Sequence, residues 1–376
     1  MVSLFLVLLR RVSIAKPFIG DEEIEAVVDV LRSGTLSHGK IVEDFEREFA
    51  SFIGVKHAIA VANGTVALDT ALKIVGVRAG DEVITTPFTF IATANSILYQ
   101  NAKPVFADIN LKTYNLDPDD VLEKITDKTK AIIVVHLYGQ PADMQALSEI
   151  ARDYKLILIE DCAQAHGAEF REKKVGGLGD VGVFSFYPTK NMTTGEGGML
   201  VTDNDEYARR ARIIRDHGQT SKYVHEEIGY NYRMTNMAAA IGRVQLKRLE
   251  ELNLKRMRNA EFLTKNLNNI KSLTTPYIDP RVKHVFNQYV VRLEDNSPVS
   301  RDQFSRKLNE KGVETAVHYP TPIHHQPLYK RLGYPQDICP NSIEASRKVL
   351  SLPVHPQLTI EDLEYIVQSV KEILSQ

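Results

Sequence analysis

Between residues 57 and 202, short runs rich in β-branched residues alternate with helix-like segments, and this alternation constrains the fold more than any other feature of the chain. It predicts parallel strands joined by crossover helices. The run at residues 156–159 is apolar at every position, as expected of a strand that is covered on both faces. The expected strands are residues 57–62, 82–86, 103–108, 130–137, 156–161, 181–186 and 198–203.

Apolar residues at helical spacing predict the helices, and the chain changes character after residue 203. The expected helices are residues 65–75, 90–100, 118–126, 144–154, 207–214, 235–267, 300–312 and 359–375. A loop is expected at 218–223, and two later strands at 287–294 and 313–320. We therefore expect an α/β fold. A large domain over 1–250, with an N-terminal extension at 1–13, would hold a mixed, mostly parallel sheet covered by helices, and a smaller C-terminal α+β domain would cover 251–376.

Composition excludes several classes of function. The chain has 376 residues, and its 46 Lys plus Arg against 48 Asp plus Glu give a formal charge of −2, with no basic block for nucleic acid. Cys162 and Cys339 are the only cysteines and no CxxC spacing occurs, so we expect no metal site and no disulfide, and a reducing cytoplasm fits best. The apolar run at 4–9 is too short to span a bilayer, and we expect no membrane partner.

Polar residues recur where three expected strands end, which is where open α/β sheets bind ligands. The first group follows the strand at 57–62, where Asn63 and Gly64 lead into a helix that opens at Thr65. Gly64 allows a tight turn, and the free amides of Thr65 and Val66, with the Thr65 hydroxyl, can hold a phosphate at the positive end of the helix. Asn-Gly-Thr is equally a turn followed by a helix N-cap, so both interpretations stand.

The second group follows the strand at 156–161, which delivers Glu160 and Asp161 to its carboxyl end, with Gln164 three residues later. Side chains alternate across a strand, so one of the two carboxylates should face the crevice. That carboxylate can pair with a protonated ring nitrogen, or it can cap the next turn.

The third group is the stretch FSFYPTKNMTTGEGGM, in which Ser185 and Lys190 lie at and beyond the end of the strand at 181–186. Glycines at 195, 197 and 198 allow close backbone approach. A lysine in an apolar site has a depressed pKa and acts as a nucleophile or base near neutral pH. A solvated surface lysine is the alternative interpretation.

Together the three groups supply a phosphate cradle, a carboxylate for a ring nitrogen and a lysine amine. Pyridoxal 5'-phosphate requires this combination, since it forms a Schiff base with a lysine and places its pyridinium nitrogen against a carboxylate. The order and spacing of the three groups make the combination more specific than any one of them.

These motifs belong to a longer series that resembles the sugar-nucleotide aminotransferases of the DegT/DnrJ/EryC1/StrS family, within fold type I of the pyridoxal-phosphate enzymes. The likeness covers nearly the whole chain after about Ile14. It is carried by the segments KPFIGDEEIEAVVDVLRSGTLSHG, ANGTVAL, GDEVITTPFTFIATANSI, VHLYGQPADM, IEDCAQAHGA, FSFYPTKNMTTGEGGM, GYNYRMTNMAAAIG and AVHYPTPIHHQP.

The resemblance implies roles for single residues. Lys190 would form the Schiff base, Asp161 would bind the pyridine nitrogen, and Gln164 would contact the hydroxyl side of the ring. The remaining roles are an aromatic stacked on the ring, Phe90; a phosphate site of Gly64, Thr65, Val66 and Ser185, with Asn231 from a second subunit; and a sugar-binding segment that contains His318 and Tyr319. His136 is interpreted as structural.

The resemblance also implies the reaction. An amino acid, by family analogy L-glutamate, would give its amino group to the keto group of a nucleotide-linked sugar, yielding an amino sugar for polysaccharide or glycan biosynthesis. Two subunits of a homodimer would share each active site. Two alternatives are a pyridoxal-phosphate-dependent sugar dehydratase, whose known members carry histidine at the position of Lys190, and a non-catalytic regulatory or binding protein.

Overall fold

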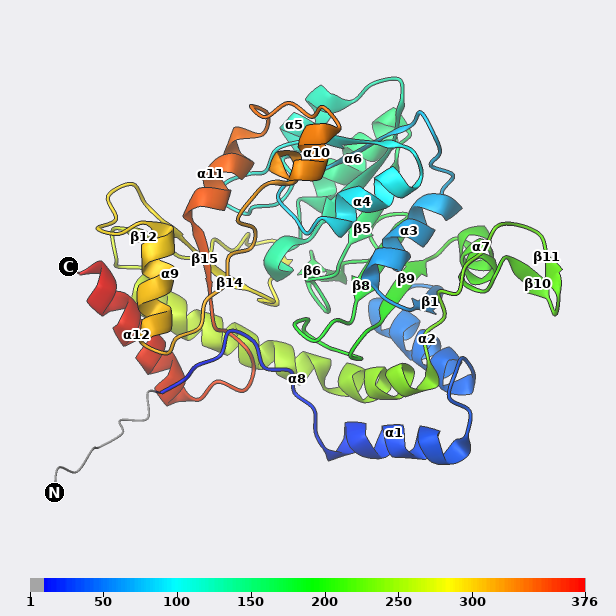
Figure 1. Cartoon of the computed structure of the whole chain (residues 1–376), viewed down its shortest axis with the longest axis horizontal. Coiled ribbons are helices and arrows are strands. Elements are labelled where there is room, and N and C mark those ends of the chain that lie inside the picture. The colour runs from blue at the N-terminus through cyan, green and yellow to red at the C-terminus, as the bar shows by residue number, and fades with distance from the viewer. Residues whose placement is uncertain (1–9, 376) are drawn as a thin grey trace.

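The computed structural model describes residues 10–375 and shows a seven-stranded sheet covered by helices on both faces (Figure 1). Residues 1–9 of the expected extension lie outside the described residues. In spatial order the strands are β1 His57–Val61, β9 Gly198–Thr202, β8 Val181–Ser185, β5 Ile157–Asp161, β4 Thr129–Val135, β2 Glu82–Thr85 and β3 Lys103–Phe106. All seven expected strands are confirmed. The sheet is mixed because β9 runs antiparallel to both of its neighbours.

Alternation along the strands explains why they are apolar at every position. In β1, Ile59 faces one core with α3 and α7, whereas Ala58 faces another core with α2 and α8. In β4, Ile133 faces the first core, whereas Ile132 faces a third core with α5 and α6. The covering helices are α2 Lys40–Ile53, α3 Gly64–Ile74, α4 Ala92–Tyr99, α5 Pro118–Lys124, α6 Met144–Tyr154 and α7 Asp205–Arg215.

The long helix α8 Asn236–Leu267 runs beneath the sheet and continues into a separate C-terminal core (Figure 1). Its first half packs on α2 and on α1 Asp21–Ser33, a pair of helices that the apolar pattern did not predict. The C-terminal core contains a second sheet with strand order β12 Leu273–Thr274, β14 Tyr289–Leu293 and β15 Val349–Leu352, and the helices α9 Arg301–Glu310 and α12 Ile360–Leu374. The expected division at 250/251 falls inside α8 and stays a prediction.

The remaining elements are short. A protruding hairpin, β10 Gln219–Ser221 and β11 Val224–His225, replaces the expected loop at 218–223 (Figure 1). The strand expected at 313–320 is wrong, because only Val313 and Ala316 form isolated bridges, each to a different segment. The others are η1 Leu137–Gly139, η2 Ile323–His325, α10 Pro327–Arg331, α11 Pro340–Lys348, and a small sheet of β13 Val282–Lys283, β6 Glu169–Phe170 and β7 Lys173–Lys174. Within residues 10–375, no helix is long and apolar enough to cross a membrane.

A buried ion pair closes the free edge of the sheet at β1. Glu46 of α2 accepts a hydrogen bond from the amide of Ala60 at 2.8 Å and contacts Arg215 at the end of α7, and Arg215 donates to the carbonyl of Ala60 at 2.9 Å. Both charged side chains are buried. The pair therefore satisfies the outward backbone groups of an edge strand and ties two helices to it.

Glu46→Ala should lower the free energy of unfolding by about 3–5 kcal/mol, because it leaves a buried guanidinium without its partner. Glu206→Ala is the matched control, since its pair with Arg209 is exposed to solvent and should contribute little to stability. Urea unfolding of both variants measures the difference. Equal losses would contradict the role given to the buried pair.

Candidate active site

A cavity of about 910 Å³ opens at the carboxyl ends of β5 and β8, beside the first turn of α3. It brings together ten of the eleven residues that the sequence singled out: Gly64, Thr65, Val66, Phe90, Asp161, Gln164, Ser185, Lys190, His318 and Tyr319. Asn231 is the exception. It is exposed at a bridge to Asp216 and does not line this cavity within one chain.

Close approach of α3 and β8 builds one end of the cavity. A Cβ atom at Gly64 would lie 2.7 Å from the Cβ of Ser185, so only glycine lets the helix start against the strand end. The amide of Val66, expected to be free, instead donates to the side chain of Asn63 at 3.0 Å, as the N-cap interpretation predicts. Within residues 10–375, the amides of Gly64 and Thr65 and the Thr65 hydroxyl have no hydrogen-bond partner. Two amides and the Thr65 hydroxyl thus remain for an anion at the positive end of α3, and the Ser185 hydroxyl, which accepts from the Tyr187 amide at 3.5 Å, can still donate there.

The two adjacent carboxylates of β5 point to opposite sides, as the strand alternation predicts. Glu160 is fully buried behind the cavity, where it accepts bonds from the amides of Gly176, Leu178 and Gly179 at 2.7–2.8 Å and contacts His136 at 3.0 Å. This network supports the structural interpretation of His136. Cys162 lies close to both side chains, but the oxygens of Glu160 are already occupied by these donors.

Asp161 faces the cavity although it is almost completely buried. It accepts hydrogen bonds from the Thr93 hydroxyl at 2.9 Å and from the amide of Ala163 at 3.2 Å. Burial raises the pKa of this carboxyl, and the two hydrogen bonds and the charge of Lys190 offset only part of that rise. A cationic ring nitrogen in the cavity would supply the counter-charge that Asp161 lacks.

Lys190 lies on the turn after β8, where its amide donates to the carbonyl of Tyr187 at 2.9 Å. In the described part of the chain its amine forms no hydrogen bond or ion pair. Desolvation lowers the pKa of this amine, and the nearby Asp161 opposes that shift. These observations favour a desolvated amine over a solvated surface lysine, because Lys190 lines the cavity near a carboxylate.

A chain of polar contacts places the other predicted residues on the opposite wall. Gln164 accepts from the amide of Tyr138 at 2.7 Å and donates to the Tyr319 hydroxyl at 2.9 Å. His318 contacts the Ser351 hydroxyl at 2.9 Å through Nδ1, and the Tyr138 hydroxyl donates to the His318 carbonyl. Burial and the charge of Lys190 lower the pKa of His318 to about 4, so its ring is neutral near pH 7.

The structure adds residues that the sequence reasoning missed. Thr93 holds Asp161, and Tyr187, Glu196 and Gln288 line the cavity. Tyr187 is 48% exposed and Phe90 is 58% exposed, and both line the cavity, so each offers aromatic surface to a ligand there. Tyr187 is the one that could have been found, because it lies between Ser185 and Lys190 in the same motif.

Comparisons with known proteins agree with this geometry. Residues 17–371 match the sequence model of the DegT/DnrJ/EryC1/StrS aminotransferase family. GDP-perosamine synthase of Caulobacter vibrioides is 39% identical, over 97% of this chain and 99% of that protein. A dTDP-3-amino-3,6-dideoxy-alpha-D-galactopyranose transaminase of Aneurinibacillus thermoaerophilus is 40% identical, over 92% and 93%. The crystal structure of S. venezuelae DesV in complex with a ketimine intermediate is 37% identical, with a TM-score of 0.91 over 94% of this chain and 95% of that one.

Asp161→Asn should raise the free energy of unfolding of the cofactor-free protein above that of wild type at neutral pH. Because burial raises the pKa of Asp161, its penalty is absent below the ordinary carboxyl pKa of about 4 and develops as the pH rises through the raised value. The gain should therefore shrink on acidification, and urea unfolding at several pH values measures it.

Glu160→Gln is the matched control, because this neighbouring carboxylate has its acceptor bonds filled by main-chain amides. Its replacement should destabilise the protein. If Asp161→Asn lost stability as well, Asp161 would be an ordinary structural carboxylate.

Proposed function

The chain belongs to the DegT/DnrJ/EryC1/StrS aminotransferase family. From this premise we propose a role for each of the residues that line its cavity. The expectations of fold type I, of pyridoxal 5'-phosphate as cofactor and of a sugar-nucleotide aminotransferase are confirmed. The observation that carries the proposal is the amine of Lys190, which has no polar partner among residues 10–375 and lies near the buried Asp161, in a cavity that also contains the start of α3.

The open donors fit the cofactor's phosphate, and the charges fit its ring. The amides of Gly64 and Thr65, with the hydroxyls of Thr65 and Ser185, would hold the phosphate. Asp161 would hold the protonated ring nitrogen, with Gln164 near the ring hydroxyl and Phe90 on a ring face. When bound, this cofactor supplies an aldehyde for amines and a ring that accepts carbanion charge.

Lys190 is proposed as the residue that moves the proton. Its lowered pKa increases the fraction of neutral amine near pH 7, and a neutral amine can take a proton from the Cα of the amino donor. The resulting Lys190 ammonium would then give that proton to the cofactor carbon that receives the amino nitrogen. The same amine serves both half-reactions, because the second is the first in reverse.

The acceptor is proposed to be a keto group on a nucleotide-linked sugar, bound near His318 and Tyr319. Both residues line the cavity. The Nδ1 atom of His318 contacts the Ser351 hydroxyl, and the Tyr319 hydroxyl accepts a hydrogen bond from Gln164, so both side chains are fixed in position. L-Glutamate is the proposed donor. A cytoplasmic location is proposed on the cysteine content alone.

A homodimer is proposed because Asn231 lies outside its own chain's cavity. Asn231 is exposed between Tyr230 and Tyr232, whose rings stack at 4.7 Å, and the Tyr232 hydroxyl donates to Asp69 of α3 at 3.1 Å. The segment is thus held firmly while Asn231 faces outward, where it could reach the phosphate site of a second subunit.

The two alternatives from the sequence are disfavoured by the site. A dehydratase of this family would carry histidine where this chain has Lys190. A purely regulatory protein would have no need of an amine, a carboxylate and an anion site that converge on one cavity.

Lys190→Ala should abolish amino transfer from L-glutamate to every member of a panel of keto sugar nucleotides, while far-UV circular dichroism stays unchanged. Loss of a positioned proton carrier alone costs about 10²–10⁴-fold in rate. Lys173→Ala, at an exposed lysine of β7, is the control and should keep wild-type activity. A Lys190→Ala variant that still transfers amino groups would refute the assignment.

Asn231→Ala should also lose activity, and the shared site can be tested by mixing it with Lys190→Ala in refolded or co-expressed dimers. In a mixed dimer one of the two sites has both native residues, so random pairing should restore roughly a quarter of the sites. Activity counted per chain measures this. No recovery on mixing, with heterodimers verified by tags, would mean that each site is built from one chain.

A further inference from the structure

One segment leaves the C-terminal sheet, crosses to the large sheet's side and returns. After β12 the chain runs through residues 276–288, here called the crossing segment, before it re-enters the sheet as β14. On the way it forms β13, which pairs with β6. Since β6 follows β5 closely in the chain, the crossing segment joins the C-terminal core to the part of the molecule that carries Asp161.

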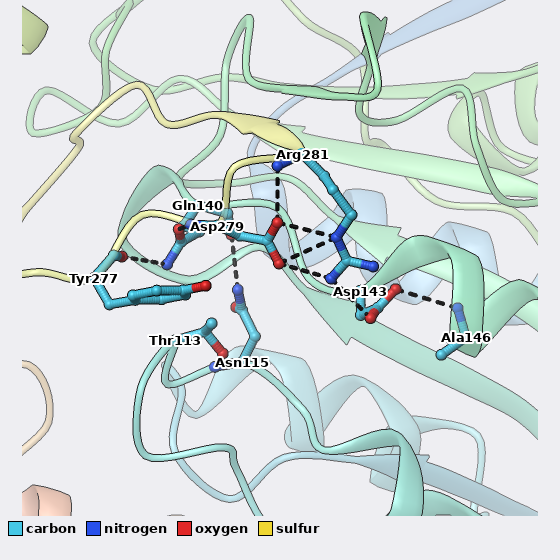
Figure 2. Close-up of polar contacts among 8 residues, drawn as sticks. All are labelled: Thr113, Asn115, Gln140, Asp143, Ala146, Tyr277, Asp279 and Arg281. Atoms are coloured by element: carbon cyan, nitrogen blue, oxygen red, sulfur yellow. Dashed lines mark hydrogen bonds and ion pairs between the residues drawn. The ribbon is translucent and has the colours of Figure 1, made fainter.

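The outer part of the crossing segment is fixed by side chains (Figure 2). Arg281 contacts Asp279 at 2.6 Å and Asp143, the N-cap of α6, at 2.9 Å. Gln140 accepts from the amide of Asp279 at 3.0 Å and donates to the carbonyl of Tyr277 at 3.1 Å. Among the described residues, the side-chain hydrogen bonds and ion pairs of this outer part reach Gln140 and Asp143, neither of which lines the cavity.

The inner part packs against the cavity wall through its main chain. The amide of Val285 donates to the carbonyl of Gly139 at 3.0 Å, and that of Gln288 donates to the carbonyl of Tyr138 at 3.2 Å. Gly139 has a positive φ of 98°, and a Cβ there would lie 2.9 Å from the amide nitrogen of Asn287. The close fit places Asn287 against the turn that carries Lys190.

Asn287 forms hydrogen bonds with the residues that precede and follow Lys190 on that turn. Its Nδ2 donates to the main-chain carbonyl of Thr189 at 3.1 Å and to Oδ1 of Asn191 at 2.9 Å. Asn191 in turn donates to Oδ1 of Asn253 at 2.7 Å, and Asn253 donates to the carbonyl of His166 at 2.8 Å. All three asparagines are buried. Because each carboxamide donates to the next, the bonds reinforce one another in a dry environment.

We propose that Asn287 is a positioning residue for Lys190, which it holds through the main-chain carbonyl of Thr189 and the side chain of Asn191; the proposal rests on the proposed role of Lys190. The amine of Lys190 has no partner of its own within residues 10–375, so its place in the cavity is set by its main chain. The Lys190 amide reaches only Tyr187 on the same turn. Asn253 and the carbonyl of Val285 bind the turn at Asn191, whereas Asn287 binds it on both sides of Lys190, and Asn287 does not line the cavity itself.

The test compares Asn287→Ala with Asn259→Ala in the cofactor-loaded enzyme. Asn259 is the matched control, because it is a buried asparagine whose Nδ2 also donates to a main-chain carbonyl, that of His355 at 3.0 Å. Two properties are measured: kcat and KM for the keto sugar, and the midpoint of the pH titration of the visible absorption of the bound cofactor, which reports on the nitrogen of Lys190.

Asn287→Ala should lower kcat by about 10- to 100-fold, since a displacement near 1 Å costs that much, while KM changes by less than about two-fold. The absorption midpoint should move upward, because a loosened turn admits water and removes part of the desolvation that disfavours a charged nitrogen. Asn259→Ala should change neither property, although both variants should lose thermal stability.

The proposal is overturned if Asn287→Ala alters kcat and the midpoint no more than Asn259→Ala does, or if it acts on KM alone. Should Asn287→Ala fail to fold, Asn287→Leu fills a similar volume without donors and is judged by the same two measurements. A fully active Asn287 variant would leave the assignment of Lys190 intact, because that assignment is tested separately by Lys190→Ala.

Discussion

The hydrogen bonds of Glu160 determine which of the two adjacent carboxylates of β5 faces the cavity. This carboxylate lies at the end of β5 and is surrounded by three main-chain amides and His136, so it cannot rotate toward the cavity without leaving them unsatisfied. The next residue of the strand must then point the other way. Asp161 therefore faces the cavity as a consequence of how its neighbour is buried.

The energetics of the cavity follow from that arrangement. Asp161 and Lys190 are both displaced from their ordinary pKa values by burial, and their mutual attraction compensates for only part of the cost. Such groups lower the stability of the cofactor-free protein, and the hydrophobic cores on the two faces of the large sheet offset that cost. Perturbed groups that converge on one cavity are typical of catalytic sites.

Much of this could be predicted from the sequence. All seven strands of the large sheet follow from apolar runs, and the carboxyl ends of β5 and β8 bring Asp161 and Ser185 to one cavity. Phe90, His318 and Tyr319 also line this cavity, but the family resemblance and not the strand pattern pointed to them. The sequence left one feature open and could not predict two others. The Val66 amide is taken by Asn63, which is one of the two interpretations that the motif allows. Thr93 and Asn287 come from segments whose contacts depend on tertiary packing, and residues 313–320 bridge two different segments instead of forming a strand.

The helix α8 has a mechanical consequence. With 32 residues and a rise of about 1.5 Å for each, it is a rod of about 48 Å that carries parts of two cores, and it contains no proline. A rod of this kind resists bending, so the two ends cannot move independently. Any opening of the C-terminal part must pivot beyond Leu267, and it would strain the crossing segment, which offers a second attachment at a different point. Helix α8 and the crossing segment therefore connect the two cores at two separate points. This double connection restricts movement of the turn that carries Lys190.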